Sequence, residues 1–199
     1  ATSKISSLDD LEAVASLGFR GEALPSIASV ARLTLCSRSL DGDTAWQLEA
    51  DGGDISEPAP AAHPQGTTVE VHDLFYNTPA RRRFLRTERT EFGHIEKWIR
   101  RLALSRPEIA FTLTHNQRTV LQLPAAKDAD AQRQRVARIC GEAFAEQCVY
   151  IEREVEGIAL SGWIALPTFN RSQPDLQYWF VNGRSISDRT LAHAVRHAY

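Results

Sequence analysis

Residues 66–84 read GTTVEVHDLFYNTPARRRF, and they combine a strand signal, a turn signal and a run of arginines. Residues 67–71 alternate polar and apolar side chains, which is the period of a half-buried strand. Asn77-Thr78-Pro79 ends that strand, because proline has no N–H for a ladder and asparagine favours turns. The turn then delivers the arginines at 81–83. Spacing alone fits either a core strand with a polar exit or a strand that presents arginines at a site.

Upstream, residues 18–24 read GFRGEAL and lead into a helical run through Val30. The two glycines allow backbone conformations that aim successive N–H groups at one point. A helix N-terminus behind them adds unpaired donors and a partial positive charge, so the segment predicts an anion site. Pro25 is tolerated only in a first turn, so the helix cannot begin much before Gly21. The motif matches neither common glycine-rich phosphate pattern, and a plain helix–helix turn stays open.

The charges fall into two opposed blocks. Residues 39–80 hold eight acids and no Lys or Arg, whereas residues 81–106 hold eight Arg and one Lys against three Glu. Of the 23 basic residues in the chain, 20 are arginine, whose planar guanidinium suits bidentate phosphate contacts. The basic block therefore predicts a localised phosphate or nucleic-acid surface. A solvated helix face with salt bridges such as Glu96 to Arg100 fits it equally well.

The composition is that of an ordinary globular protein: 199 residues, a net charge of −2 and 43% hydrophobic residues. It excludes a disordered or collagenous chain. No apolar run reaches membrane-spanning length and no signal peptide opens the chain, so we expect a soluble, cytoplasmic protein. Methionine is absent and the chain opens with Ala1, from which we expect an internal fragment. The three cysteines form no metal-ligand pattern and are expected to pack as small buried hydrophobes.

The periodicity predicts an α+β fold in two parts. Residues 124–130 are small and charged, and we place a domain boundary there, between 1–126 and 127–199. Before it we expect hairpin strands at 33–36 and 45–49, a strand at 67–71, a helix at 91–104, and strands at 111–114 and 119–123 that turn at Asn116-Gln117. After it we expect a helix at 133–139, strands at 149–155, 158–165 and 177–181, loops at 58–64 and around Pro167, and a last helix from Ser187.

Four segments together resemble one known family. They are residues 1–5 (ATSKI), residues 18–24 (GFRGEAL) with 26–30 (SIASV), residues 66–81 with Phe84-Leu85, and residues 181–184 (VNGR) followed by Asp188-Arg189. In this order and at these separations they are similar to the MutL family of DNA mismatch-repair ATPases, which belongs to the GHKL superfamily. The resemblance covers nearly the whole chain. It implies a GHKL-type α/β sandwich, truncated at its N-terminus, over 1–126 and part of a ribosomal protein S5 domain 2-like domain over 127–199.

The resemblance also implies a nucleotide site. The segment that matches residues 1–24 is the ATP lid in that family, and the Gly66-Thr67 position matches its motif on the sheet floor near the nucleotide. The residues implied to bind ATP are Thr2, Ser3, Lys4, Arg20, Gly21, Glu22, Ala23, Leu24 and Thr67. Mg²⁺ would accompany ATP, but the family's general base, its magnesium ligand and its adenine-recognising residue match nothing in this chain. No catalytic residue is therefore assigned, and the chain alone is expected to be inactive.

For the intact protein, the resemblance implies an ATP-dependent conformational switch that binds DNA and dimerises. Its implied partners are DNA, a mismatch-recognition protein and a downstream endonuclease or helicase. Arg184 and Arg189 are the implied DNA contacts. The alternative from another class is an ATP-independent DNA clamp or scaffold, which the arginine block and the missing catalytic residues favour. A topoisomerase of the same superfamily is a third interpretation, against which residues 77–81 (NTPAR) argue.

Overall fold

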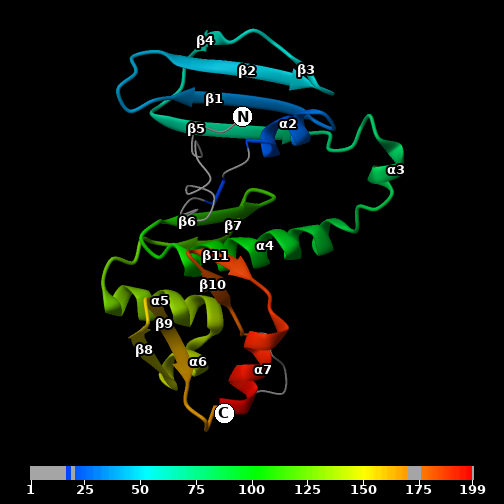
Figure 1. Ribbon diagram of the computed structural model, residues 1–199. Coiled ribbons are helices and arrows are strands. Elements are labelled where there is room, and N and C mark those ends of the chain that lie inside the picture. The colour runs from blue at the N-terminus through cyan, green and yellow to red at the C-terminus, as the bar shows by residue number, and fades with distance from the viewer. Residues whose placement is uncertain (1–16, 19–20, 170–175, 199) are drawn as a thin grey trace. The chain divides into compact units, whose positions relative to one another are not determined.

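The computed structural model of the chain describes residues 17–18, 21–169 and 176–198 (Figure 1). It divides into two compact units between Thr87 and Glu88. The mixed α and β composition expected from the periodicity is confirmed. Within the described residues, no helix combines the length and the apolar character needed to cross a membrane.

The first unit is built on one antiparallel sheet with the strand order β3-β2-β1-β5, and β4 also pairs with β2. Leu33 and Leu35 point to one face of this sheet, where they pack against Ala28 and Ile27 of helix α2 (Figure 1). The predicted hairpin and the strand at 67–71 are confirmed, but the expectation that this strand is half-buried is wrong, because every residue of β5 is exposed. The prediction of a loop throughout 58–64 is wrong, because residues 59–61 pair with β2 as a short edge strand. The elements of this unit are α2 (Ala23–Ala28), β1 (Arg32–Arg38), β2 (Ala45–Asp51), β3 (Asp54–Ile55), β4 (Ala59–Ala61), β5 (Gly66–His72) and α3 (Pro79–Arg82).

The described residues of the second unit form a long helix, α4, several hairpins and three further helices. Each of three hairpins turns through two consecutive residues with positive φ: Asn116-Gln117, Glu156-Gly157 and Asn182-Gly183. This is the backbone of the tight two-residue turn that matches strand twist. The elements are α4 (Glu88–Ser105), β6 (Phe111–His115), β7 (Arg118–Leu123), α5 (Ala129–Cys140), α6 (Glu142–Glu146), β8 (Cys148–Val155), β9 (Ile158–Ala165), β10 (Trp179–Val181), β11 (Arg184–Ile186) and α7 (Arg189–Ala198).

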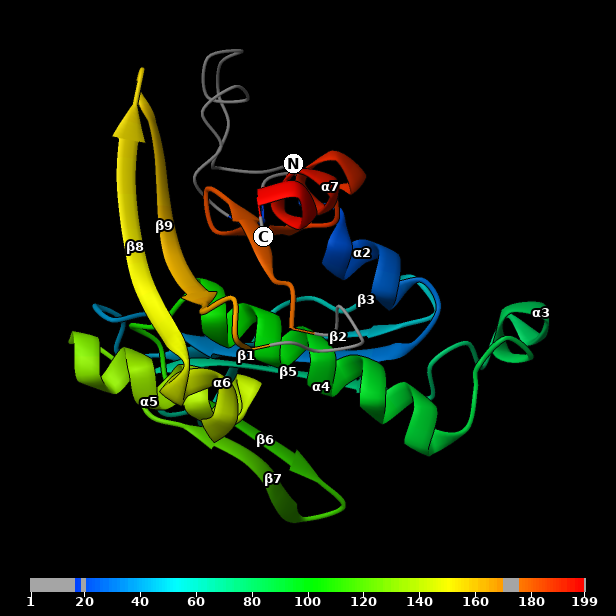
Figure 2. The ribbon, with the colours of Figure 1, turned by 90° about the horizontal axis from the view of Figure 1, so that it is seen from below.

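Most of these elements were expected from the sequence. The predicted turns at Asn116-Gln117 and at Gly157 are confirmed, and so is the Glu96–Arg100 salt bridge, at 2.7 Å. Helix α6 and strand β11 were not predicted, because five and three residues are too short to show a period. Figure 2 shows the β8–β9 hairpin as a long curved ribbon that extends well beyond α5 and α6.

The cysteines pack largely as expected. Cys36 and Cys148 are buried and Cys140 is partly buried, and all three are free thiols. Cys148 lies in an apolar cluster with Val136 and Phe144, against which Cys140 also packs. Burial raises the pKa of the Cys140 thiol to about 11. This thiol is therefore almost entirely protonated near neutral pH and is a poor nucleophile.

Arg135 is the one buried charged residue among those described, with 4% of its surface exposed. Its guanidinium donates to the backbone carbonyls of Ala103 at 2.9 Å, Arg106 at 3.2 Å, Ile109 at 2.8 Å and Pro124. The first of these carbonyls belongs to the last turn of α4, where the helix dipole favours a positive charge. Desolvation lowers the pKa of this guanidinium, and the four carbonyls take the place of a carboxylate partner. Arg135 thus joins α5 to the end of α4 and the end of β7.

Residues 124–130, which the sequence predicts to be a linker, make two hydrogen bonds that fix them to neighbouring segments. Ala126 is buried and its N–H donates to the carbonyl of Pro107 at 2.7 Å. Asp128 caps α5 by accepting from the N–H of Ala131 at 2.8 Å. The division of the chain into family domains at 126/127 stays a prediction.

Replacing Arg135 with methionine should destabilise the second unit by about 3 kcal/mol, the upper end for one lost buried partner, because four hydrogen bonds to backbone carbonyls are lost together. Native-state hydrogen exchange of the amides in α5 and β7 measures this loss. The matched control is Arg138→Met on the same helix, since Arg138 is exposed and its guanidinium donates to the Gln122 carbonyl. Equal protection in the two variants would contradict the assignment.

Candidate functional site

The first turn of α2 is open to an anion. Gly21, just before it, has φ of +68°, a conformation that side chains with a Cβ rarely adopt. Glu22 occupies the N-cap position but its side chain makes no capping hydrogen bond, and no acidic residue lies in the first turn. The first N–H groups of a helix have no partner within the helix. This end of α2 therefore offers backbone donors that no described side chain caps.

The other end of α2 is fixed to the sheet through the link at residues 29–31. The Asn77 side-chain amide donates to the carbonyl of Ser29 at 2.9 Å. The N–H of Phe75 donates to the carbonyl of Val30 at 2.7 Å, and that of Gly52 to the carbonyl of Ala31 at 3.3 Å. Two turns of the sheet, after β5 and after β2, thus hold three consecutive carbonyls. This contact sets the position of α2 on its face of the sheet.

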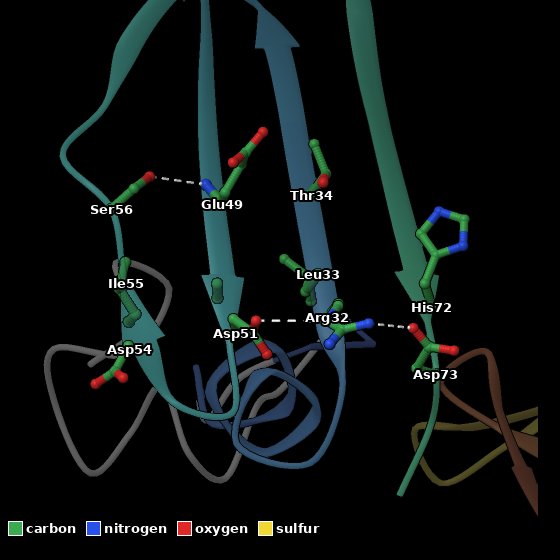
Figure 3. Close-up of a pocket in the computed structure, with 11 residues that line it drawn as sticks. Arg32, Leu33, Thr34, Glu49, Asp51, Asp54, Ile55, Ser56, His72 and Asp73 are labelled. Atoms are coloured by element: carbon green, nitrogen blue, oxygen red, sulfur yellow. Dashed lines mark hydrogen bonds and ion pairs between the residues drawn. The ribbon is translucent and has the colours of Figure 1, made fainter. Parts of the chain in front are cut away.

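Arg32 ties the same two turns together from the start of β1 (Figure 3). Its guanidinium lies 2.7 Å from the Asp73 carboxylate and 3.4 Å from the Asp51 carboxylate, and it stacks over the Tyr76 ring at 4.9 Å. The Tyr76 hydroxyl donates to Asp51. Arg32 therefore links the ends of β2 and β5, the two strands that pair with β1.

These contacts shift two pKa values. The hydrogen bond from Tyr76 and the neighbouring Arg32 hold the pKa of the Asp51 carboxyl below its usual range. The same hydrogen bond raises the pKa of the Tyr76 hydroxyl. Because the folded-state pKa of Asp51 is lowered, its contribution to stability is present above the unfolded-state pKa and is lost as the pH falls through the folded-state pKa.

A hollow of about 720 Å³ lies beside this network, mainly on the sheet face opposite α2 (Figure 3). Its lining includes Arg32 together with Glu49, Asp51, Asp54 and Asp73. Two of these carboxylates already neutralise Arg32, so the hollow is acidic on balance. An anionic ligand such as a nucleotide phosphate or DNA is disfavoured there. We interpret this face as structural.

The structure describes only part of the predicted nucleotide site. Thr2, Ser3, Lys4 and Arg20 lie outside the described residues. Gly21, Glu22, Ala23 and Leu24 form the start of α2 described above.

Thr67 lies near the other end of β5, opposite Ser37 of β1, and the two hydroxyls are 2.8 Å apart. Directly paired residues share a face, so Thr67 points to the face that α2 covers, roughly 17 Å along the strand from the Arg32 end. The described residues therefore place Thr67 and α2 on one face but do not bring them into contact.

The two predicted DNA contacts lie close together in the sequence, in one unit. Arg184 is a partly buried residue that begins β11, directly after the Asn182-Gly183 turn. The Arg106 guanidinium packs against Gly183, so that a Cβ there would lie 3.1 Å from its nearest nitrogen. Arg189 is exposed and begins α7, where Asp188 caps the helix by accepting from the N–H of Leu191 at 2.8 Å.

Sequence reasoning missed the residues that position α2. It took Asn77 only as the end of a strand and assigned no role to Arg32 or Tyr76. The one available signal was the cluster of turn residues around Asn77-Thr78-Pro79, which cannot reveal a hydrogen bond to Ser29, 48 residues away. Across the part of the chain that the structure describes, no three His, Cys, Asp or Glu side chains gather as a metal site.

Comparison with known proteins connects this geometry to a family. A family model described as "DNA mismatch repair protein, C-terminal domain" matches residues 136–199. The chain is 60% identical to the DNA mismatch repair protein MutL of Pseudomonas fluorescens, over 100% of the chain and 32% of that protein. It is 60% identical to MutL of Azotobacter vinelandii, over 100% of the chain and 31% of that protein. The chain thus spans about a third of the length of these curated relatives.

Comparison with solved structures also matches the chain to DNA repair proteins. The Aquifex aeolicus MutL ATPase domain complexed with ADP matches 98% of the chain with a TM-score of 0.74 and 30% identity, and the chain covers 72% of that domain. A structure described as the N-terminal domain of a DNA repair protein matches 97% of the chain, with a TM-score of 0.72 and 25% identity over 62% of that domain.

Replacing Tyr76 with phenylalanine should raise the pKa of the Asp51 carboxyl toward its ordinary value, because the largest cause of the lowered pKa is removed. Acid-induced loss of structure in the first unit should then begin at a higher pH than in the wild type. NMR titration of the Asp51 carboxyl carbon measures the shift. In the control, Tyr150→Phe, the hydroxyl is lost from an exposed tyrosine of the second unit and the titration should not change. An unchanged Asp51 titration in Tyr76→Phe would refute the network.

Proposed function

The chain belongs to the MutL family of DNA mismatch-repair proteins, and we propose that it supplies the phosphate-enclosing lid and part of the DNA-binding surface of an ATP-dependent conformational switch. It would act within a longer protein that dimerises and recruits a mismatch-recognition protein and a downstream endonuclease or helicase. The family-domain division at 126/127 is part of this proposal: 1–126 would belong to the GHKL-type ATPase domain and 127–199 to the S5 domain 2-like domain.

The observation that carries the nucleotide proposal is the uncapped first turn of α2 behind Gly21. A positive φ at Gly21, no capping side chain and no acid in the first turn leave a helix N-terminus suited to phosphate. The Aquifex aeolicus relative is complexed with ADP, which supports the same ligand class. Thr2, Ser3, Lys4 and Arg20 would complete the lid around the triphosphate, with Thr67 on the sheet floor.

Within this proposal the chain's own residues bind and orient phosphate. Backbone N–H groups of residues 21–24 would hold the phosphate oxygens, and Lys4 and Arg20 would add positive charge. ATP, with Mg²⁺, would supply the free energy that switches the protein between conformations. No residue of this chain is proposed as the general base or as the magnesium ligand.

The fixed end of α2 suggests how a lid could act. Ser29, Val30 and Ala31 are held by two turns of the sheet, so the end of α2 would keep its position while the first turn of the helix binds phosphate. Pro25 in the first turn restricts the start of the helix. Ordering of the lid by ATP would then be relayed to the sheet through these three carbonyls.

Replacing Gly21 with valine in the complete gene product should weaken ATP binding by at least about tenfold, because a β-branched residue disfavours positive φ where the backbone approaches phosphate. Equilibrium titration with a fluorescent ATP analogue measures the affinity. Gly93→Val is the control, since Gly93 lies on α4, without positive φ and with open space around its Cβ position. Wild-type affinity in a folded Gly21→Val protein would remove the lid assignment.

For DNA, we propose Arg184 and Arg189 as phosphate contacts. Arg189 is the stronger candidate, since it is exposed at the start of α7 and takes part in none of the ion pairs described for the chain. Arginine contacts to phosphate fix a protein on the duplex without reading its sequence. Such contacts suit a protein that must act wherever a mismatch occurs.

A specific observation also favours the alternative, an ATP-independent DNA clamp. Arg81, Arg82 and Arg83 are all exposed, and Phe84 beside them is 81% exposed. A basic surface with an exposed aromatic ring can bind a nucleic-acid backbone and stack on a base without any nucleotide. DNA binding that is independent of ATP and is lost when these arginines are replaced would favour this alternative.

Replacing Arg189 with glutamate should weaken binding to all DNA sequences alike and lower the slope of log affinity against log salt by about 1, because one phosphate contact is lost. ATP binding should not change. Fluorescence anisotropy over a range of salt concentrations measures the DNA affinity and its slope. The control is Arg153→Glu on the exposed β8–β9 hairpin, which should keep the wild-type slope. If Arg189→Glu keeps both affinity and slope, Arg189 is not on the DNA surface, which must then rest on Arg184 or on the arginines at 81–86.

A further inference from the structure

We propose that His193 and His197 of α7 form a bidentate site for a divalent first-row transition-metal ion. The two residues lie four positions apart on a helix of ten residues, so their side chains lie one above the other on one face. Both are exposed. Leu191 and Val195 lie on the other side of the helix, which leaves the histidine face to solvent.

The geometry of the two rings suits chelation. The Nε2 atoms are 3.1 Å apart, whereas the ring centroids are 4.3 Å apart, so the rings converge at their nitrogen edges. Metal–imidazole bonds are about 2.0–2.1 Å long, and two of them meeting at slightly more than a right angle place their nitrogens about 3.0–3.1 Å apart. A metal ion at the apex of that angle, beside the line that joins the two Nε2 atoms, would therefore leave their separation unchanged.

Without metal, the same contact is a hydrogen bond between one Nε2–H and the lone pair of the other Nε2. This arrangement requires different tautomers of the two rings. Metal binding would move that proton to Nδ1, so that both Nε2 lone pairs face the ion. The metal ion thus takes the place of the Nε2–H proton that joins the two rings.

The ligand set indicates which ion binds and how strongly. Imidazole is a ligand for copper, nickel and zinc, and the expected order of affinity is Cu²⁺ above Ni²⁺ and Zn²⁺. None of the described Asp, Glu, Cys or other His side chains joins the pair as a third ligand, so water would complete the coordination. Arg189, one turn before His193, adds an unfavourable like charge. The site is therefore an exchangeable one, unlike a closed structural centre.

The test is a titration of the tag-free complete gene product with Cu²⁺ in a non-coordinating buffer near pH 7.5. Calorimetry gives the affinity, and electron paramagnetic resonance at less than one equivalent of Cu²⁺ reports how many nitrogens bind. We expect two imidazole nitrogens in the wild type and one in His193→Gln or His197→Gln, with the affinity reduced at least about tenfold by loss of the chelate. Circular dichroism checks that each variant is folded.

The matched control is His94→Gln, which removes an exposed histidine from α4 that has no histidine one turn away. It should keep the wild-type affinity and the two-nitrogen spectrum. If the spectrum and affinity of His193→Gln and His197→Gln equal those of the wild type, the site lies elsewhere and the proposal is overturned. An equal loss in His94→Gln would overturn it as well.

Discussion

The second unit depends on one buried cation. Arg135 places its guanidinium among four backbone carbonyls, from the end of α4, the segment that follows it and the end of β7. Such a group cannot reach water, so the fold must keep all of these segments in place around it. The apolar cluster of Ala103, Leu121, Leu123 and Ile139 packs the same elements together. Hydrophobic burial brings α4, α5 and the β6–β7 hairpin together, and the guanidinium fixes how their ends meet.

The first unit uses an exposed cation for a comparable purpose. Arg32 is shared by Asp51 and Asp73, and Tyr76 closes the network, so the exits of β2 and β5 are tied at the start of β1. Exposed ion pairs contribute little stability one at a time, and the network is better understood as a positioning device. Its neighbours Asn77, Phe75 and Gly52 hold the carbonyls that follow α2. The proposed lid thus ends at a helix whose far end is fixed.

Acidic and basic side chains occupy different parts of the described surface. The face of the sheet opposite α2 is acidic around Arg32, which disfavours phosphate, whereas exposed arginines occur on α3 and at the start of α7. In the second unit, part of the basic block is used internally, because Arg100 pairs with Glu96 and also donates to the carbonyl of Ile139. Arginine content alone therefore overstates the surface available to DNA. Within the basic block, the arginines at 81–83, 86 and 89 are exposed, whereas those at 100, 101 and 106 are partly buried.

The sequence by itself determined the periodic strands, the long helix α4, the hairpin turns at Asn116-Gln117 and Gly157, and the family to which residues 18–30, 66–85 and 181–189 point. These features depend on local backbone preferences and on the spacing of apolar residues, which a single chain displays directly. Only the tertiary structure decided the roles of Arg135, Arg32 and Asn77, and the convergence of His193 and His197. Asn77 bonds to a carbonyl 48 residues away and Arg135 to one 32 residues away. No local period encodes which carbonyl a distant side chain will meet, because that pairing follows from how the elements pack.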